Sequence, residues 1–461
     1  MSTFSGLNTA YSGLAAARAG LDVTGQNIAN ATTQGYTRQR LETSAAAPVR
    51  PTLFAAGTRT GEGVLAEGVA RLGDAHLEAR VRITAGAAGY TAVRAQAFSA
   101  LEDGLREPGT NGVSKPLQDF WSGWQELSNH PDKDAPASTL LSAAGQLTSR
   151  IASGYREVEE QWASVRSSAD GLVVEVNDAA AQVADLNRQI RSAVASGASA
   201  NELVDRRTTL AATLAGLTGA TVRDNADGTA DVLLAGNPLV SGTTARALQV
   251  TGPIQLDGAG TVQVEWTHRP GASAGMESGE LAATISLLAP ADAGGALAQA
   301  AAGYDDFARQ LADQVNALHA GAGKGAFFAY QPERAAASLT VLPTRREDLA
   351  AGAPGAGGFD GSVAAAISRV GTGTGSPDAA WSAFVVALGS AARVELQGNA
   401  LAEVSATSAL QQQLGATSVS MDEEQVNLLQ YQHAYQGAAR VMTAVDEMLD
   451  VLINRMGIVG R

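Results

Sequence analysis

With 461 residues, the chain is too long for one compact core, and we expect two to four domains. A formal net charge of −14 without a basic run argues against nucleic-acid binding and against an anionic membrane surface, and the absence of cysteine excludes disulfides and thiolate metal sites. Hydrophobic residues make up 45% but aromatic residues only 5%, so the apolar content is mostly Ala, Val and Leu, which favours long packed helices.

The first predicted element is a helix over residues 3–30 with a narrow apolar stripe. The members of this stripe step by three and four residues in turn, as in a coiled-coil seam: Leu7, Ala10, Leu14, Ala17, Leu21, Thr24 and Ile28. Gly6, Gly13 and Gly20 recur every seven residues beside it. Because a glycine inside a helix costs about 1 kcal/mol relative to alanine, we interpret the repeat as a face that a partner backbone approaches closely. Asn, Thr and Gly in residues 27–36 then end the helix in a turn.

The middle of the chain predicts a helical body interrupted by a β-rich module. Short strands and loops are expected over residues 40–85, and a short strand over 338–342. Helices are expected over 88–106, 115–220 with breaks near Pro131 and Gly197, 281–318 and 380–414. Residues 220–275 combine a turn at Asn225–Gly228 with apolar residues that alternate with polar ones, as in half-buried strands. This order suggests that the β-rich module is inserted into a body made from both halves of the chain.

The last predicted helix fills residues 421–456 and carries a second apolar stripe. Its members are Leu428, Tyr431, Tyr435, Ala438, Met442, Val445, Leu449, Leu452 and Met456. Ser420 and Glu423 have the spacing of a capping box, in which each side chain takes an unpaired backbone N–H. The neighbouring Asp422 and Glu424 also favour the positive end of the helix dipole. We interpret these acidic residues as capping residues and not as a metal or catalytic site.

Motifs for chemistry are weak throughout the chain. A G-x-S-x-G match at residues 271–275 would make Ser273 a nucleophile, but Pro270 interrupts the strand that such a turn requires. Five histidines are scattered without zinc-site spacing. The sequence therefore predicts no catalytic residue, no cofactor and no metal. A hydrolase with its site in the β-rich module is kept as the less favoured alternative.

Targeting signals are not evident in the sequence. The first cationic side chain is Arg18, so we expect no cleaved secretory signal of the kind that begins with a basic segment. We also expect no apolar run long enough to span a bilayer, and hence no membrane insertion.

Both ends of the chain carry motifs of a known family. The N-terminal motif comprises Ser12–Leu14, Leu21, Asn27–Ala31, Gly35–Tyr36 and Arg38–Gln39. The C-terminal motif comprises Met421–Glu424, Asn427–Leu429, Tyr431–Gln432, Ala434–Gln436, Ala438–Val441 and Asp446–Met448. Weaker internal matches are Arg71, Asp74, Leu77, Asn201–Arg207, Asn316–His319 and Phe327–Phe328. In these residues the chain resembles the bacterial flagellar hook-associated protein 1 family, the hook–filament junction proteins. It departs from the family pattern at Gln34, where a proline is usual.

The resemblance implies a structural role without enzymatic activity. Proteins of this family form a ring of copies between hook and filament, so the implied partners are copies of the chain, hook protein and the second junction protein on the filament side. The family is exported unfolded by the flagellar type III apparatus to the extracellular flagellum, and a cytoplasmic export chaperone holds its C-terminal region. Another flagellar axial protein, such as hook protein or the second junction protein, is the alternative within the same class.

We therefore predict a mainly α fold with long terminal helices that pair as a coiled coil, a helical-bundle body and a small inserted β domain. The expected domains are residues 1–36 with 418–461, residues 37–219 with 276–417, and residues 220–275. The predicted assembly interface consists of Leu7, Leu14, Leu21, Asn27, Ile28, Asn30, Leu428, Tyr431, Tyr435, Met442, Val445, Leu449 and Leu452.

Overall fold

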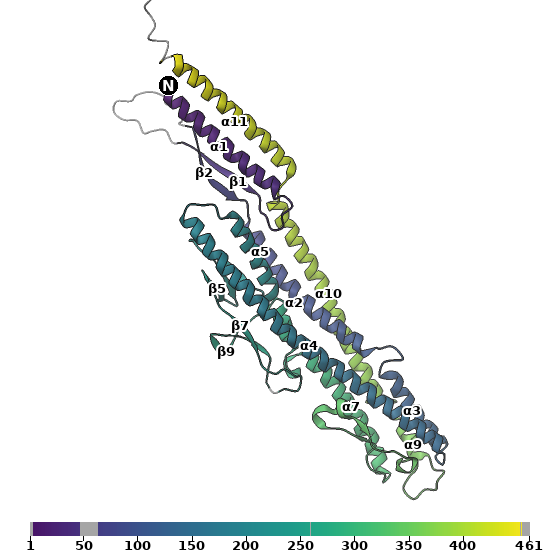
Figure 1. Ribbon diagram of the computed structural model, residues 1–461. Coiled ribbons are helices and arrows are strands. Elements are labelled where there is room, and N and C mark those ends of the chain that lie inside the picture. Colours follow the sequence, from purple (N-terminus) through teal and green to yellow (C-terminus); the bar gives the residue numbers. More distant parts are fainter. Residues whose placement is uncertain (1–2, 47–62, 259, 452, 454–461) are drawn as a thin grey trace, which may run out of the picture.

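The computed structural model describes residues 3–46, 63–258, 260–451 and 453. Figure 1 shows an elongated molecule with both terminal helices at one end and a helical body that extends away from them. Long helices dominate, and the strands form small separate antiparallel sheets. This arrangement confirms the predicted mainly helical fold class, whereas supercoiling of the terminal helices stays a prediction.

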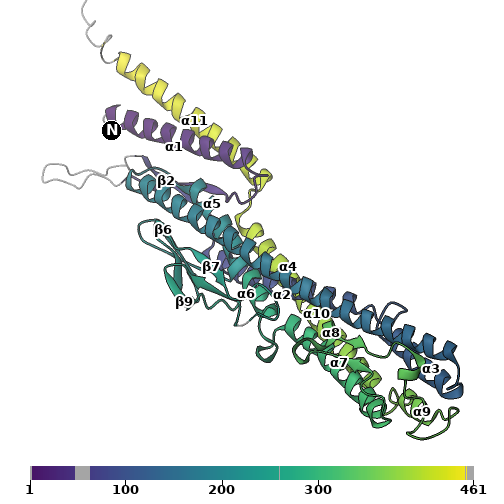
Figure 2. The ribbon, with the colours of Figure 1, turned by 60° about the horizontal axis from the view of Figure 1, so that its bottom comes forward.

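The terminal helices α1 (Thr3–Ala29) and α11 (Met421–Asp450) lie side by side in both ribbon views (Figures 1 and 2). On its other side, α1 packs against an antiparallel pair of strands, β1 (Gln39–Ala45) and β2 (Val64–Arg71). Because α1 has neighbours on both sides, the residues it buries are mostly small: Ala10, Ala16, Ala17, Gly20, Thr24 and Asn27. The predicted stop after this helix is confirmed.

The body is built around α2 (Ala75–Leu105), α3 (Ser114–Asn129), α4 (Asp134–Ala195), α5 (Asn201–Thr218) and α10 (Pro377–Thr417), with α2 packed along α10. The predicted helix breaks before α4 and after it are confirmed. The expectation of strands and loops up to residue 85 is wrong, because α2 begins at Ala75. There the Asp74 side chain caps the helix by accepting hydrogen bonds from the N–H groups of His76 and Leu77.

Two small antiparallel sheets pack against α4 (Figure 2). The first contains β3 (Thr221–Asp224), β4 (Ala230–Leu234), β5 (Asn237–Ser241) and β6 (Thr244–Ala245) in that order. The second contains β7 (Leu248–Thr251), β8 (Gln263–Trp266) and β9 (Arg269–Ser273). The predicted turn at Asn225–Gly228 connects β3 and β4, with Gly228 at a φ of +82°. Apolar strand residues such as Val232 and Trp266 belong to the same hydrophobic core as the residues of α4.

The chain returns through α6 (Glu280–Leu287) and α7 (Ala296–Gly321). The expectation of one continuous helix over residues 281–318 is wrong. Pro290 lacks an N–H for the helix and Gly294 adopts a φ of +87°, so the chain forms the short 3-10 helix η1 (Ala291–Ala293) between them. The shorter elements that follow are β10 (Phe328–Ala329), η2 (Pro332–Arg334), α8 (Ala335–Ser338), β11 (Thr340–Val341), η3 (Arg346–Asp348) and α9 (Ser362–Ser368).

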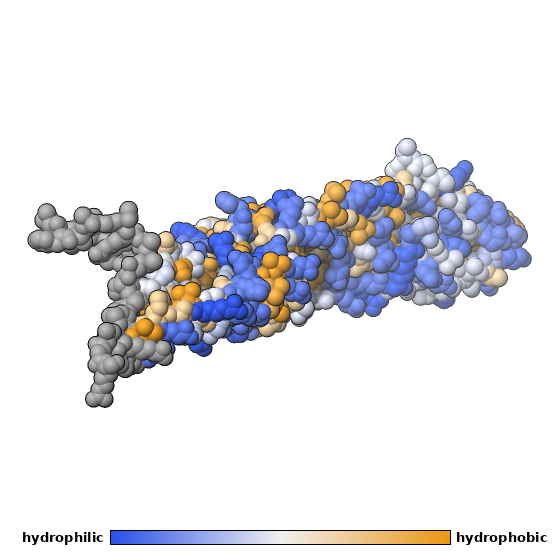
Figure 3. Space-filling view, turned by 90° about the horizontal axis from the view of Figure 1, so that it is seen from above, coloured by the Kyte–Doolittle hydropathy of each residue, from blue (hydrophilic) through white to orange (hydrophobic). Residues whose placement is uncertain are grey.

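Apolar side chains interrupt the polar surface at several places along the molecule (Figure 3). The helical segment from Pro377 to Asp450 contains an 18-residue window with a mean hydropathy of 1.3, of which 17% is buried. By length and composition this window could cross a membrane, which differs from the expectation that no apolar run is long enough. A helix of a soluble protein can have the same length and composition, so the window by itself does not identify a membrane-spanning segment.

Candidate assembly interface and hinge

The two terminal helices run antiparallel in a register that repeats every seven residues. A Cβ atom added to Gly20 would lie 2.4 Å from a ring carbon of Tyr431, so this glycine makes room for the tyrosine ring. One repeat along, a Cβ on Gly13 would lie 3.9 Å from the Cβ of Ala438, which is ordinary van der Waals contact. The glycine repeat therefore does face a partner helix. The group that comes close to Gly20 is the Tyr431 side chain and not the backbone of α11.

The next repeat places Gly6 opposite Val445, which is buried, unlike the other members of the C-terminal stripe that the structure describes. Most other predicted interface residues are half-buried in the single chain: Leu7, Leu14, Leu21, Ile28, Asn30, Leu428, Tyr431, Met442 and Leu449. Tyr435 is exposed, and Leu452 lies outside the described residues. The pairing of α1 with α11 thus covers only part of each stripe.

Asn27 lies at the centre of a polar cluster at the base of the helix pair. The residue is 1% exposed, and the hydrogen bonds of its side chain all go to other residues of the same chain. This position differs from its predicted place on a surface between copies. The amide nitrogen donates to the Gln39 carbonyl oxygen at 2.8 Å and to Glu424 Oε2 at 3.1 Å. The amide oxygen accepts from the Tyr36 hydroxyl at 2.9 Å and from the Gln39 N–H at 3.0 Å. Asn27 therefore joins the end of α1 to the start of α11.

Glu424 is the acidic partner in this cluster and is also only 1% exposed. Its Oε1 atom accepts from Arg38 Nε at 2.8 Å, and Arg38 also pairs with the more exposed Glu423 at 2.5 Å. The capping box predicted for Ser420 and Glu423 is only half formed. Ser420 accepts from the Glu423 N–H as expected, but the Glu423 carboxylate bonds to Arg38 instead of the helix N-terminus. Glu424 lies in the first turn of α11 as expected, but its carboxylate is also buried and paired, which the capping interpretation did not include.

A second group of polar contacts joins this cluster to the body. Asp205 on α5 accepts from the Thr37 N–H at 3.1 Å and from Arg71 Nε at 2.6 Å. Arg71, at the end of β2, also pairs with Glu78 on α2 at 2.7 Å. Burial, reinforced by the charges of Asp205, Glu202 and Glu424, raises the pKa of Tyr36 from 10.0 to about 12, so its hydroxyl stays a donor to Asn27 even above the pH at which an ordinary tyrosine ionises.

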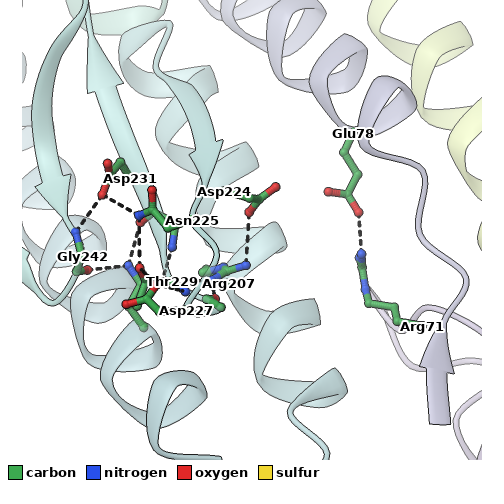
Figure 4. Close-up of polar contacts among 12 residues, drawn as sticks. Arg71, Glu78, Arg207, Asp224, Asn225, Asp227, Thr229, Asp231 and Gly242 are labelled. Atoms are coloured by element: carbon green, nitrogen blue, oxygen red, sulfur yellow. Dashed lines mark hydrogen bonds and ion pairs between the residues drawn. The ribbon is translucent and has the colours of Figure 1, made fainter. Parts of the chain in front are cut away.

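A third group of contacts attaches the β-rich module to α4 and α5 (Figure 4). Arg207 on α5 donates to the Gly228 carbonyl oxygen at 2.6 Å and pairs with Asp224 at 3.4 Å. The same guanidinium donates to Asn187 on α4, whose buried amide also donates to the carbonyl oxygens of Ala230 and Gly242. Arg207 therefore holds the β3–β4 turn against the helices.

These contacts bring together residues from distant parts of the family motifs. Asn27 and Arg38 come from the N-terminal motif and Glu424 from the C-terminal one, while Asp205 belongs to a weaker internal match. We call the residues Asn27, Tyr36, Arg38, Asp205 and Glu424 the hinge cluster. Sequence reasoning missed Glu424 as a site residue, because a helix N-terminus explains an acidic residue at that position equally well. It missed Asp205 because this residue lies inside α5, where an acidic side chain is ordinary on a solvent-facing helix surface.

A cleft of about 790 Å³ lies beside the hinge cluster, between the loop after α1 and the helices α4 and α5. Its lining includes Tyr36, Asp205 and Arg206.

Ser273, the possible nucleophile of the G-x-S-x-G match, lies outside this cleft. Ser273 is the last residue of β9, its hydroxyl accepts a hydrogen bond from the Gly275 N–H, and the next helix begins only at Glu280. This arrangement is not the strand–nucleophile–helix turn that a hydrolase elbow requires. Among the described residues, no group of three or more His, Asp or Glu side chains could hold a metal ion.

Comparison with known families assigns the middle and both ends of the chain to flagellar proteins. Residues 98–325 match the helical domain of flagellar hook-associated protein FlgK. Residues 7–37 match the flagella basal body rod protein family, and residues 410–456 match the C-terminal domain of flagellar basal body rod FlgEFG proteins. The matches at the two ends thus coincide with the paired helices.

Individual relatives agree with these family matches. Flagellar hook-associated protein 1 of Bacillus subtilis (strain 168) is 28% identical over the full length of both chains. The same-named protein of Escherichia coli (strain K12) is 31% identical over 52% of this chain and 44% of its own length. The fold is similar to that of the flagellar hook junction protein FlgK from Burkholderia pseudomallei, with a TM-score of 0.61 and 15% identity over 75% of this chain and all of that one. Over its full length the chain is therefore similar to flagellar hook-associated protein 1.

Proposed function

We propose that this protein is a structural component of the bacterial flagellum that joins hook to filament and self-assembles through its terminal helices. The observation that carries this proposal is the α1–α11 pair, which the hinge cluster holds at its base. The pair leaves large apolar side chains of α11 exposed: Val426, Leu429, Tyr435, Val441 and Met448. Apolar surface of this extent along one helix is typical of a protein that is completed by neighbours.

The proposed mechanism is that neighbouring copies bury the parts of the two stripes that the single chain leaves uncovered. Fully burying one large apolar side chain contributes roughly 1.5–3 kcal/mol, so a few such residues per contact are enough to hold a ring of copies. In this ring, one side would contact hook protein and the other the second junction protein of the filament. We propose no catalytic role for the chain.

The proposal includes a route to the flagellum. The chain would be made in the cytoplasm and exported by the flagellar type III apparatus without a cleaved signal peptide. A cytoplasmic export chaperone would cover the exposed apolar residues of α11 before export. Coverage by a chaperone accounts for how a helix with so little buried surface avoids aggregation in the cytoplasm.

The experiment that tests this function uses a deletion strain complemented with the chain carrying Leu449→Asp. Leu449 is half-buried and lies one helical turn beyond Val445, which faces Gly6 of α1, so an aspartate there would bury a charge in any completed contact. We expect the variant to be exported while filaments detach and flagellin is shed into the medium. Attached filaments counted by electron microscopy, together with the amount of exported variant, give the result.

The matched control is Val174→Asp, which adds the same charge at an exposed apolar position on α4 of the body. We expect this control to support normal motility. If the Leu449→Asp strain swims as well as the wild type, the terminal stripe does not hold the assembly together and the proposed mechanism is wrong.

A further inference from the structure

Three arginine side chains line one cavity in the body, where α2 and α5 meet the β-rich module. The cavity has a volume of about 230 Å³ and is also lined by residues of α4, β3 and β4. Arg71, Arg82 and Arg207 reach it from the end of β2, from α2 and from α5, and their side chains are only 15%, 11% and 9% exposed. We call these three residues the arginine cluster. Figure 4 shows Arg207 with Asp224 and, across from them, Arg71 with Glu78.

The arginine cluster contains more buried cations than buried carboxylates. Both buried carboxylates bond to Arg71, Glu78 at 2.7 Å and Asp205 at 2.6 Å. The carboxylate nearest to Arg207 is that of Asp224, which lies 3.4 Å away and is 71% exposed. Because water screens an exposed carboxylate, Asp224 compensates a buried cation only weakly. Two of the three arginines therefore lack a buried partner of opposite charge.

Arg82 is the least compensated of the three. Its Nη1 atom lies 3.9 Å from the nearer Glu78 oxygen, which is beyond hydrogen-bond distance, and its guanidinium donates no hydrogen bond to another residue that the structure describes. Burial lowers the pKa of Arg82, and the charges of Glu78 and Asp224 offset only part of that effect. Burial also lowers the pKa of Arg207, with a further decrease from the charge of Arg71. Burial acts on Arg71 as well, but its two carboxylate partners outweigh it and raise its pKa.

We propose that this cavity binds a small oxyanion, phosphate or sulfate, between Arg82 and Arg207. The proposal goes beyond the flagellar role and does not depend on it. A buried charge is costly unless it is paired, and a guanidinium forms strong, often bidentate hydrogen bonds with such anions. The cavity is smaller than the roughly 300–1,000 Å³ of sites for drug-sized ligands, which favours an inorganic ion over a nucleotide. A bound anion would connect α2 to α5.

The test is isothermal titration calorimetry of inorganic phosphate, and separately of sulfate, into the purified full-length chain at neutral pH. Both ions also stabilise proteins by exclusion from the surface, but that effect does not saturate at one ion per chain. We expect a saturable heat for one ion per chain, with a dissociation constant on the order of 1 mM. Chloride at matched ionic strength should give no such heat, because it only screens the arginines.

The first variant is Arg82→Gln, which removes the least compensated cation. We expect it to weaken phosphate binding at least about tenfold, because the anion loses a charged hydrogen-bond donor. In chloride its unfolding temperature should not fall, since the substitution removes a buried charge without breaking a hydrogen bond between described residues. The matched control is Arg80→Gln on the same helix, at an exposed arginine that donates to Gln412 at 2.8 Å, and it should leave phosphate binding unchanged.

The second variant is Thr208→Asp, which supplies a fixed carboxylate in place of the anion. Thr208 lines the same cavity and directly follows Arg207 in α5. We expect phosphate binding to be lost and the unfolding temperature in chloride to rise, because the new carboxylate pairs with the uncompensated arginines. A misfolded variant would not gain stability, so this result separates the site from a folding defect. Thr213→Asp, at an exposed position of α5, is the control and should change neither property.

The other outcomes would overturn the proposal. Absence of a saturable heat in the wild type would show that the cavity binds no oxyanion. Unchanged binding in Arg82→Gln, or equal loss in Arg80→Gln, would show that phosphate binds elsewhere or responds only to surface charge. Competition by adenosine monophosphate with the affinity of phosphate would show that the site takes the phosphate group of a larger molecule and not a free oxyanion.

Discussion

At the scale of single residues, the hinge cluster depends on a buried carboxylate that has enough partners. A buried charge is costly unless it is paired and hydrogen-bonded, and Glu424 meets both conditions through Arg38 and Asn27. Glu423, one residue earlier, pairs with the same arginine but keeps its side chain 62% exposed. The two glutamates thus form a natural comparison between a buried and an exposed partner of one cation.

We expect Glu424→Ala to destabilise the terminal helix pair by about 3 kcal/mol, because it leaves Arg38 without its buried partner and one Asn27 N–H without an acceptor. Hydrogen exchange of the α1 and α11 amides in the full-length chain measures this change. Glu423→Ala should change the same exchange by only about 0–1 kcal/mol, since exposed ion pairs contribute little. Equal effects of the two variants would mean that burial of Glu424 is not what stabilises the hinge.

At the scale of elements, the pairing of α1 with α11 explains why a helix tolerates regularly spaced glycines. Only Gly20 meets a tight approach, to the ring of Tyr431, whereas Gly13 has room for a methyl group. The seven-residue repeat arises because both helices present one narrow face to each other along their length. The helix pair therefore requires a small residue at one of these positions and accepts larger residues at another.

This difference predicts opposite effects of the same substitution. Gly13→Ala should stabilise α1 by about 1 kcal/mol through helix propensity. Gly20→Ala should be destabilising, because displacing the Tyr431 ring costs about 1–3 kcal/mol and exceeds that gain. Trypsin cleavage after Arg18 reports opening of α1, and we expect it to slow in the first variant and to accelerate up to about tenfold in the second. Acceleration in both variants would refute the assigned register.

At the scale of the whole molecule, stability is distributed unevenly between the body and the terminal helices. The α4 helix buries side chains along its length, from Ala137 to Ile190, and shares its core with the β-rich module. In contrast, α11 buries only Glu424 and Val445 between Met421 and Asp450. A protein with this distribution keeps a rigid body while its ends depend on neighbouring copies.

We therefore expect the amides of α11 in the monomer to exchange at least about tenfold faster than those of α4 between Leu140 and Ile190. In assembled flagella the exchange of α11 should slow to the level of α4, because neighbouring copies would bury its exposed apolar residues. Hydrogen exchange with mass spectrometry on both samples measures this change. Equal protection of the two helices in the monomer would show that α11 needs no partner for its stability.

The spacing of apolar residues and the residues that end helices or form turns were sufficient to predict the helical character of the chain and the terminal stripes. They also sufficed for the ends of α1 and α5 and the turn at Asn225–Gly228, because these depend on residues close together along the chain. The start of α2 at Ala75 and the break at Pro290–Gly294 were missed. Each has a local cause, the Asp74 cap and Pro290, but a single aspartate or proline in a sequence does not by itself identify a helix start or a break.

Only the tertiary structure decided which residues of the stripes are covered and which polar residues meet. Asn27 and Glu424 are separated by 397 positions, and an acidic residue at a helix start has the same local pattern whether it is buried or exposed. Burial depends on which surfaces the fold places against one another, so no local pattern could assign Glu424 to the hinge.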